Sequence, residues 1–291
     1  MTVFNLGSIN IDHFYRVSHL PGPGETLAAR GYMKGLGGKG ANQSVAALRA
    51  GAWVVHIGAI GEGDGWTAEE LARLGRDTGA ISRVAEPTGH GIILTDPAGE
   101  NSIVIHPGAN RAQSPAMIAQ ALAMGQAGDI LLVQNETDRQ VEAARLAQAQ
   151  GMRVFYSAAP FELAPLKAIL PHVSHLLVNA LEAAALEAET GSALADLPVQ
   201  AVIVTRGAGG AEWISAARRI HAPAPEVSAG DTTGAGDCFA GSLAAALDQG
   251  LSSGQSLRYA TAAAALQGTR PGTATAMPER AEVQTFLENR L

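Results

Sequence analysis

Short apolar segments alternate with helical ones along most of this chain. The apolar segments contain many valines, isoleucines and leucines without strict alternation, as expected of strands buried on both faces of a sheet. They lie at residues 2–9, 53–60, 129–134, 153–158, 175–179 and 201–207. Helices are predicted within 65–79, 114–125, 137–151 and 180–191, each ending on a glycine. Repeated strand–helix–strand units predict an α/β fold with a mainly parallel central sheet that helices cover on both faces.

Two segments interrupt this alternation. Residues 11–35 are extended and rich in turn residues, and residues 91–106 form two apolar runs around the turn Pro97-Ala98-Gly99-Glu100. We expect antiparallel strands there that do not join the main sheet and that form a small lid. Two unrelated surface hairpins are the alternative. No composition shift marks a linker, so we expect one domain over 1–291 with lid strands inserted at about 11–35 and 89–106.

Composition narrows the functional classes. The 291 residues carry a formal net charge of -7 without a lysine or arginine cluster, which disfavours nucleic acid and anionic membranes as partners. The one cysteine, Cys238, excludes an intrachain disulfide. The first residues do not resemble a secretory signal, and no apolar run approaches the roughly 18 residues of a membrane-spanning helix. These features predict a cytoplasmic protein.

A glycine-rich loop at residues 35–51 is the first candidate for ligand binding. Its glycines permit close approach of the backbone to a ligand, Lys39 adds a cation, and Asn42 lies where a helix begins. Met33 and Gly40 stand where a Walker A loop needs glycine and a hydroxyl residue, so the loop is of another kind. A dinucleotide-binding G-x-G-x-x-G is also missing from the second glycine cluster, which disfavours a nicotinamide-dependent dehydrogenase.

That second cluster, "DTTGAGDCF" at residues 231–239, combines small residues with an acid at the start of a predicted helix over 237–248. The backbone amides of Gly234, Ala235 and Gly236 at a helix N-terminus form a natural anion site. A carboxylate there would repel a bound phosphate, so Asp237 makes sense as a base that activates a nucleophile. Capping or compensation of the helix dipole is the alternative.

Polar residues follow two of the predicted strands. Asn10 and Asp12 are two residues apart, so they share a face at the end of the first strand, and Glu136 follows the strand at 129–134. Ligands of parallel sheets bind at the carboxyl ends of strands. An amide and a carboxylate at this edge suit the adjacent hydroxyl groups of a polyol.

With both clusters in place, the chain resembles the ribokinase (PfkB-type) carbohydrate kinases over essentially its whole length. One family motif is similar to residues 37–61 and the other to residues 231–241. The segments "GSINID", "PGPGET", "GENSIVIHPGAN" and "VQNE" are most similar to the ribokinase branch. The resemblance implies a three-layer α/β fold with a small β-sheet lid. It also implies transfer of the γ-phosphoryl group of ATP to a primary hydroxyl of a sugar, most simply D-ribose.

The resemblance also implies roles for individual residues. Asp237 would be the catalytic base, and the backbone of Gly234, Ala235 and Gly236 would form the anion hole for the γ-phosphate. The sugar pocket would be lined by Asn10, Asp12, Gly38, Lys39, Asn42 and Glu136.

On the nucleotide side, Asn179 and Glu182 of "NALE" would help place the phosphates and Mg²⁺, and Thr205 and Gly207 would flank the nucleotide. Asp231 and Thr233 would belong to a site for a monovalent cation such as K⁺. The loop at 269–278 is similar to the cation loop of ribokinases, but Ala276 stands where serine is expected.

The resemblance also implies a homodimer formed through the lid. Two other functions remain open at this point. One is phosphorylation of a nucleoside or of a different ketose or aldose on the same fold. The other is a sensor that binds sugar or nucleotide without turnover, against which the intact Gly-Ala-Gly-Asp argues.

Overall fold

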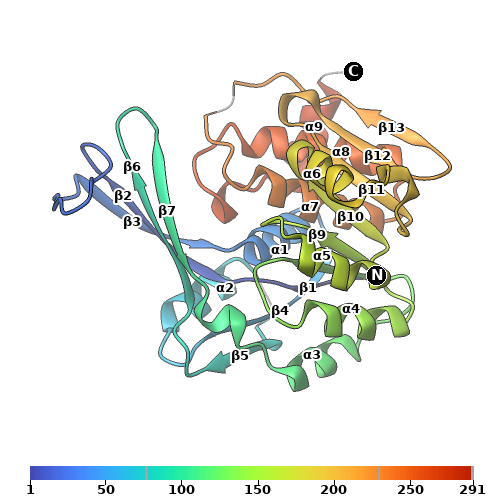
Figure 1. Ribbon diagram of the computed structural model, residues 1–291, viewed down its shortest axis with the longest axis horizontal. Coiled ribbons are helices and arrows are strands. Elements are labelled where there is room, and N and C mark those ends of the chain that lie inside the picture. Colours follow the sequence, from blue (N-terminus) through green and yellow to red (C-terminus); the bar gives the residue numbers. More distant parts are fainter. Residues whose placement is uncertain (76–77, 229, 290–291) are drawn as a thin grey trace.

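The computed structural model describes residues 1–75, 78–228 and 230–289. Within these ranges, nine strands form one large sheet in the order β13-β12-β11-β10-β9-β8-β1-β4-β5 (Figure 1). Neighbouring strands are parallel, except that β12 is antiparallel to both β11 and β13. The mainly parallel sheet predicted from the apolar runs is therefore confirmed. Its strands are β1 (Thr2–Leu6), β4 (Trp53–Gly61), β5 (Ile81–Val84), β8 (Ile130–Gln134), β9 (Arg153–Ser157), β10 (His175–Asn179), β11 (Ala201–Thr205), β12 (Ala211–Ile214) and β13 (Arg219–Ala222).

Helices bury both faces of this sheet. Successive residues of a strand point to opposite faces, and Val3 packs in one apolar cluster while Phe4 packs in another. The cluster of Val3 includes residues of α1 (Lys39–Arg49), α7 (Ala235–Asp248), α8 (Ser253–Gln267) and α9 (Arg280–Glu288). The cluster of Phe4 includes residues of α3 (Pro115–Leu122), α4 (Gln140–Ala149), α5 (Leu163–Ile169) and α6 (Ala180–Thr190). Burial on both faces explains why the strands lack polar alternation.

A smaller sheet stands apart from the large one and projects from the body of the molecule (Figure 1). It contains β2 (Asn10–Arg16), β3 (Gly31–Gly37), β6 (Gly89–Thr95) and β7 (Asn101–His106) in the order β3-β2-β6-β7. The pairs β2–β3 and β6–β7 are antiparallel as expected, but the two hairpins join through a parallel pairing of β2 with β6. The antiparallel pairing predicted within each segment is therefore confirmed, whereas the parallel pairing that joins the two hairpins was not predicted. The helix α2 (Gly65–Arg73) packs near the base of this sheet, where Leu71 belongs to the same buried apolar cluster as Ile9 and Leu36.

Some helix ends agree with the sequence and others differ, since α3 ends at Leu122 before Gly125 and α7 begins at Ala235. Ser114 caps α3 by accepting a hydrogen bond from the Met117 amide at 3.2 Å, and Gly191 ends α6 in the left-handed conformation. The helix predicted over 65–79 ends earlier, at Arg73, because Gly75 adopts a φ of 78° that stops it. Residues 76–77 of that prediction lie outside the described residues.

In the part of the chain that the structure describes, no helix combines the length and the apolar character needed to cross a lipid bilayer.

Candidate active site

The candidate base, Asp237, lies in the first turn of α7 and is only 9% exposed. Its Oδ2 accepts a hydrogen bond from Asn42 Nδ2 at 3.0 Å, and its Oδ1 accepts one from Gln43 Nε2 at 3.1 Å. Burial raises the pKa of this carboxyl group, against the Lys39 ammonium and the two hydrogen bonds, which lower it. A buried carboxylate with a raised pKa accepts a proton more readily than one in water, which suits a general base.

Two close backbone approaches bring α1 beside this carboxylate. A Cβ at Gly40 would collide with the backbone of Gly7, so the first turn of α1 sits directly on the end of β1. A Cβ at Gly241 would likewise collide with the carbonyl oxygen of Gln43, so α1 and α7 are in backbone contact. Only glycine allows such close approaches. They place the amide side chains of Asn42 and Gln43 within hydrogen-bond distance of Asp237.

A chain of buried amides extends behind the base. Gln134 Nε2 donates to Gln43 Oε1 and to Asn5 Oδ1, both at 2.8 Å, and Asn5 Nδ2 donates to Ser44 Oγ at 2.6 Å. All four side chains are fully buried. No role for these four residues follows from the local sequence pattern. The only signal was polar residues inside apolar strands, Asn5 within β1 and Gln134 at the end of β8.

Lys39 and Glu136, two of the residues expected to bind the sugar, interact with each other. Lys39 Nζ lies 3.8 Å from Glu136 Oε1, while Glu136 Oε2 accepts hydrogen bonds from the Lys39 amide at 3.1 Å and from Ser8 Oγ at 2.5 Å. Burial opposes the charge of Lys39, but the nearby carboxylates, Asp237 first and then Glu136, raise its pKa overall. Lys39 therefore remains a cation near both the candidate base and the sugar-side acids.

Asp12 lies beside this pair on the small sheet. Burial, and then the charge of Glu136, raise its pKa to about 6, while Lys39 acts in the opposite direction. A Cβ at Gly37 on the neighbouring strand would collide with the Asp12 carboxyl group. The glycine therefore makes room for the carboxylate beside the site.

Asn10 occupies the first position of β2. Its Oδ1 accepts a hydrogen bond from Asn110 Nδ2 at 2.7 Å, and Asn110 Oδ1 accepts one from the Ile9 amide at 2.9 Å. The interpretation that Asn10 and Asp12 end the first strand was wrong, because β1 ends at Leu6 and both residues belong to β2 of the small sheet. They share a face there, as the spacing of two predicted.

A cavity of about 650 Å³ opens on the other side of α7. Its walls come from the ends of β11 and β13, the first turn of α7 and the last turns of α8, and most of the lining is apolar. Thr205 and Gly207, the two residues expected to flank a nucleotide, line it together with Gly236. The remaining walls include Ala208, Ala224, Pro225, Val227, Phe239, Ala264 and Ala265.

The backbone amides at the start of α7 are not equivalent. The Ala235 amide donates to the Thr232 carbonyl oxygen at 3.1 Å. Among the described residues, no acceptor pairs with the Gly236 amide, which borders the cavity. The Gly234 φ of 81° turns the chain into the helix. Within the expected anion hole, Gly236 is thus the donor facing the cavity, and Ala235 is engaged with the protein.

Asn179 and Glu182 form a capping box at the start of α6. Asn179 Oδ1 accepts from the amides of Leu181 and Glu182, both at 2.9 Å, and Glu182 Oε2 accepts from the Asn179 amide at 2.8 Å. Asn179 ends β10, so the pair lies at the same edge of the sheet as Glu136. Glu182 is near enough to Lys39 to raise its pKa.

Asp231 joins the two loops that the sequence assigned to a cation site. Its Oδ1 accepts from the Thr233 amide at 2.9 Å, and its Oδ2 accepts from the Gly272 amide at 3.1 Å. Burial tends to raise the pKa of Asp231, but the hydrogen bonds have the larger combined effect, so the pKa is lowered overall. The residue is therefore a carboxylate that holds the loops at 231–233 and 269–278 together.

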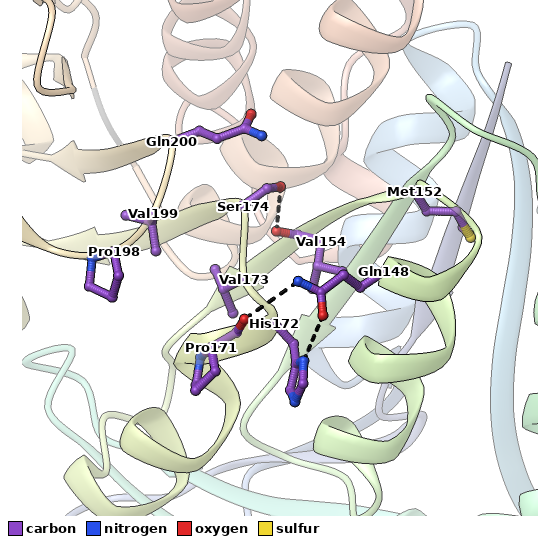
Figure 2. Close-up of a pocket in the computed structure, with 10 residues that line it drawn as sticks. All are labelled: Gln148, Met152, Val154, Pro171, His172, Val173, Ser174, Pro198, Val199 and Gln200. Carbon is purple, nitrogen blue, oxygen red and sulfur yellow. Dashed lines mark hydrogen bonds between the residues drawn. The ribbon is translucent and has the colours of Figure 1, made fainter.

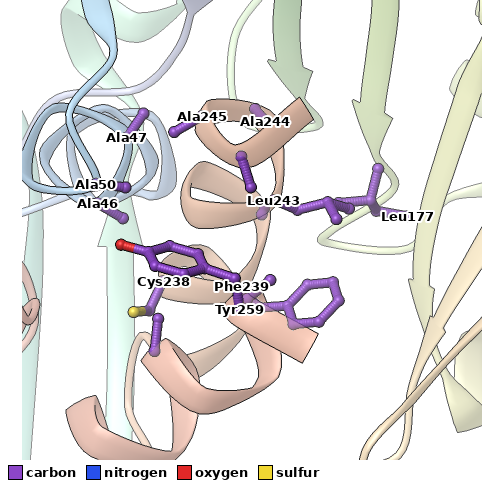
Figure 3. Close-up of a cluster of buried hydrophobic side chains, with 14 of the residues drawn as sticks. Ala46, Ala47, Ala50, Leu177, Cys238, Phe239, Leu243, Ala244, Ala245 and Tyr259 are labelled. Carbon is purple, nitrogen blue, oxygen red and sulfur yellow. The ribbon is translucent and has the colours of Figure 1, made fainter. Parts of the chain in front are cut away.

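Two other features belong to the body of the fold. Cys238 is fully buried among Phe239, Tyr259 and Ala46, so its side chain contributes to apolar packing in the first turn of α7 (Figure 3). A second depression, of about 400 Å³, contains Gln148 and Ser174 (Figure 2). It lies at the amino ends of β9 and β10, on the edge of the sheet opposite Asp237.

A buried base lies near a cation and near acids that suit a polyol, and its neighbour Gly236 lines a large, mostly apolar cavity. On a mainly parallel sheet with a small second sheet, this arrangement defines a phosphotransferase with an alcohol group as acceptor. The model of the pfkB family of carbohydrate kinases matches residues 2–280. The chain belongs to this family, and it is a carbohydrate kinase.

Individual relatives agree with this assignment. The ribokinase of Haemophilus influenzae is 36% identical over 99% of both chains, and that of Bacillus subtilis is 32% identical over 97% of this chain and 98% of the relative. The crystal structure of Thermotoga maritima ribokinase superimposes with a TM-score of 0.87 at 32% identity, over 99% of both chains. The structure of Arabidopsis thaliana ribokinase complexed with ribose and ATP gives a TM-score of 0.83 at 27% identity, over 99% of this chain and 98% of that one.

Proposed function

We propose that this protein phosphorylates D-ribose at its primary hydroxyl with ATP as the donor. The observation that carries the proposal is the position of Lys39, which pairs with Glu136 at 3.8 Å and lies close enough to Asp237 and Asp12 for both to raise its pKa. A polyol held by Asp12 and Glu136 presents its terminal hydroxyl toward Asp237. The relatives named above as ribokinases, and the Arabidopsis complex with ribose and ATP, support the choice of sugar and donor.

The reaction follows from these positions. Asp237 accepts the proton of the primary hydroxyl, the hydroxyl oxygen bonds to the γ-phosphorus, and the bond from that phosphorus to the leaving ADP oxygen breaks. The Gly236 amide and the positive end of α7 stabilise the charge on the transferred group. The Asn42 and Gln43 amides hold the Asp237 carboxylate in a fixed orientation. Asn10, Asp12 and Glu136 orient the sugar.

The carboxylates near this site fit Mg²⁺. Magnesium is usually held by one or two carboxylates together with substrate phosphates rather than by a complete protein cage. No group of three or more potential ligands among His, Cys, Asp and Glu occurs in the described parts of the chain, which agrees with that mode. Glu182, a hard oxygen donor near Lys39, would hold the ion with Asn179, directly or through water. The ion would neutralise phosphate charge.

A substrate panel tests the proposal. We expect the highest kcat/KM for D-ribose among pentoses, hexoses and nucleosides, with ATP consumption that depends on added sugar. 2-Deoxy-D-ribose is the sharpest competitor, because the deoxyribokinase of Salmonella typhi is 28% identical over 99% of both chains. Preference for deoxyribose, or for a nucleoside, would contradict the proposed substrate. ATP hydrolysis without phosphorylation of any sugar would contradict the proposed reaction.

The small sheet supports a second part of the proposal, a homodimer in which each lid is covered by its partner. Ile103 and Ile105 of the edge strand β7 are 53% and 57% exposed. Ile105 is opposite Gly91, which is opposite Asp12, so the apolar surface continues on the face that carries Asp12. A second lid on this face would hide the exposed edge and exclude water from the sugar.

Light scattering tests this assembly. Wild type should be a dimer, and the double variant Ile103→Lys/Ile105→Lys should be a monomer with a raised KM for ribose. Trp53→Ser is the matched control, because Trp53 is 81% exposed at the start of β4, outside the small sheet. A wild type that is monomeric at all working concentrations would contradict the dimer.

A further inference from the structure

A buried glutamine lies between the two loops of the expected cation site. Gln267 is the last residue of α8 and is fully buried. Its Nε2 donates to the Thr233 carbonyl oxygen at 2.8 Å and to the Gly272 carbonyl oxygen at 3.0 Å. One acceptor belongs to the loop at 231–233 and the other to the loop at 269–278. The side chain therefore links the same two segments that Asp231 joins through their amides.

The orientation of this amide follows from its partners. Two carbonyl oxygens at hydrogen-bond distance require a donor, and the NH₂ group offers one hydrogen to each. With the amide reversed, three oxygens would face one another without a hydrogen between them. Gln267 Oε1 is buried and has no hydrogen-bond partner among the described residues. The amide keeps this orientation although its oxygen is unpaired, which indicates that the two carbonyl groups determine it.

The residues present do not fit a monovalent cation. Ions such as K⁺ are held by carbonyl oxygens that replace the hydration shell. Here the Thr233 and Gly272 oxygens point at the positively polarised hydrogens of Gln267, which would repel a cation placed between them. The expected serine hydroxyl is also missing, because position 276 is a buried alanine. Asp231 retains oxygen lone pairs but already accepts two backbone amides.

We propose that the Gln267 amide replaces the monovalent cation and makes the enzyme independent of K⁺. Thr233 precedes Gly234, so the bond to its carbonyl group holds the turn that leads to Gly236 and Asp237. A cation would connect the same carbonyl oxygens by its charge, whereas the amide connects them by two hydrogen bonds. Gln267 is thus a positioning residue for the anion hole.

Wild-type protein provides the first test. Rates with ribose and ATP are measured in KCl, NaCl and tetramethylammonium chloride at equal ionic strength, and the melting temperature (Tm) is measured in the same salts. We expect rates within about twofold of one another and equal Tm values. Activation by K⁺ of about tenfold or more, or a Tm raised by K⁺ alone, would overturn the inference.

Two variants provide the second test, Gln267→Ala and the double variant Gln267→Ala/Ala276→Ser. Both remove the donors, and the second restores a hydroxyl ligand. We expect KCl, but not tetramethylammonium chloride, to raise the Tm of at least one of them by about 3 °C or more. The matched control is Gln249→Ala, which removes an amide bond to the Ala50 carbonyl oxygen away from these loops. Its Tm should not respond to K⁺.

If neither Gln267 variant responds to K⁺, the amide does not replace a cation and the inference fails. If Gln267→Ala does not fold, the wild-type salt series still decides the matter. The rate measurements rest on the proposed kinase activity, but the Tm measurements do not. Absence of sugar phosphorylation in every salt would contradict the proposed function, whereas the Tm response to K⁺ would still decide this inference.

Discussion

Replacement of Asp237 by asparagine separates its proposed chemistry from its structural role. Asparagine has nearly the same shape, and it keeps an oxygen for the Gln43 Nε2 donor. Its new NH₂ group would face Asn42, whose Oδ1 is buried and has no hydrogen-bond partner in the described parts of the chain. Rotation of the Asn42 amide therefore creates a new hydrogen bond in place of the lost one. We expect Asp237→Asn to fold normally.

The expected loss of kcat in Asp237→Asn follows from the role of the carboxylate as a general base. A general base contributes about 10²–10⁴-fold to the rate, which corresponds to roughly 3–5 kcal/mol of activation free energy. Stability should not fall, because burial raises the pKa of Asp237 and its charge is therefore unfavourable in the folded protein above that pKa. The variant should thus lose at least about a hundredfold in kcat without losing free energy of unfolding.

The assay is ADP formation at saturating ribose and ATP, with ATP binding measured by calorimetry. Asp248→Asn is the matched control, because Asp248 is also buried, lies at the other end of α7 and has a pKa raised by burial. The control should keep the wild-type kcat, and both variants should bind ATP. An Asp237→Asn enzyme with more than about a tenth of the wild-type kcat would refute the assignment of the base.

Three further predictions concern neighbouring groups. Since the pKa of Asp12 is raised from 3.8 to about 6, the free energy of unfolding of wild type relative to that of Asp12→Asn should fall by about 3 kcal/mol as pH rises through that window. Denaturant titrations of both proteins give this difference, and a difference that does not change with pH would contradict the shift. Gln43→Leu removes a hydrogen bond that lowers the pKa of Asp237, so the acid limb of the pH profile of kcat should move to higher pH. An acid limb at the wild-type pH would show that Gln43 does not affect the pKa of the base. Burial raises the pKa of Cys238 to about 12, so a thiol reagent at pH 8 should label only unfolded protein, and rapid labelling of native protein would show an opening near α7.

The sequence was sufficient wherever a local pattern controls the structure. Apolar runs without alternation correctly predicted the buried strands, and Ser114 before a proline correctly predicted the start of α3. The sequence was insufficient where the structure depends on which strands pair with one another. Asn10 and Asp12 were assigned to the end of the first strand, because nothing in the local pattern indicates that the chain leaves the large sheet after Leu6.

The buried amides behind Asp237 could not be predicted from the sequence for the same reason. Gln43 and Gln134 are 91 residues apart along the chain and meet only because β8 and α1 pack against each other. By itself, the sequence determined the strand and helix pattern, the family motifs and the presence of an acid at the start of α7. The tertiary structure alone decided which buried polar groups pair, including the amide of Gln267 with two carbonyl groups. Such pairing depends on atomic distances between segments far apart in the chain, whereas local periodicity depends only on neighbouring residues.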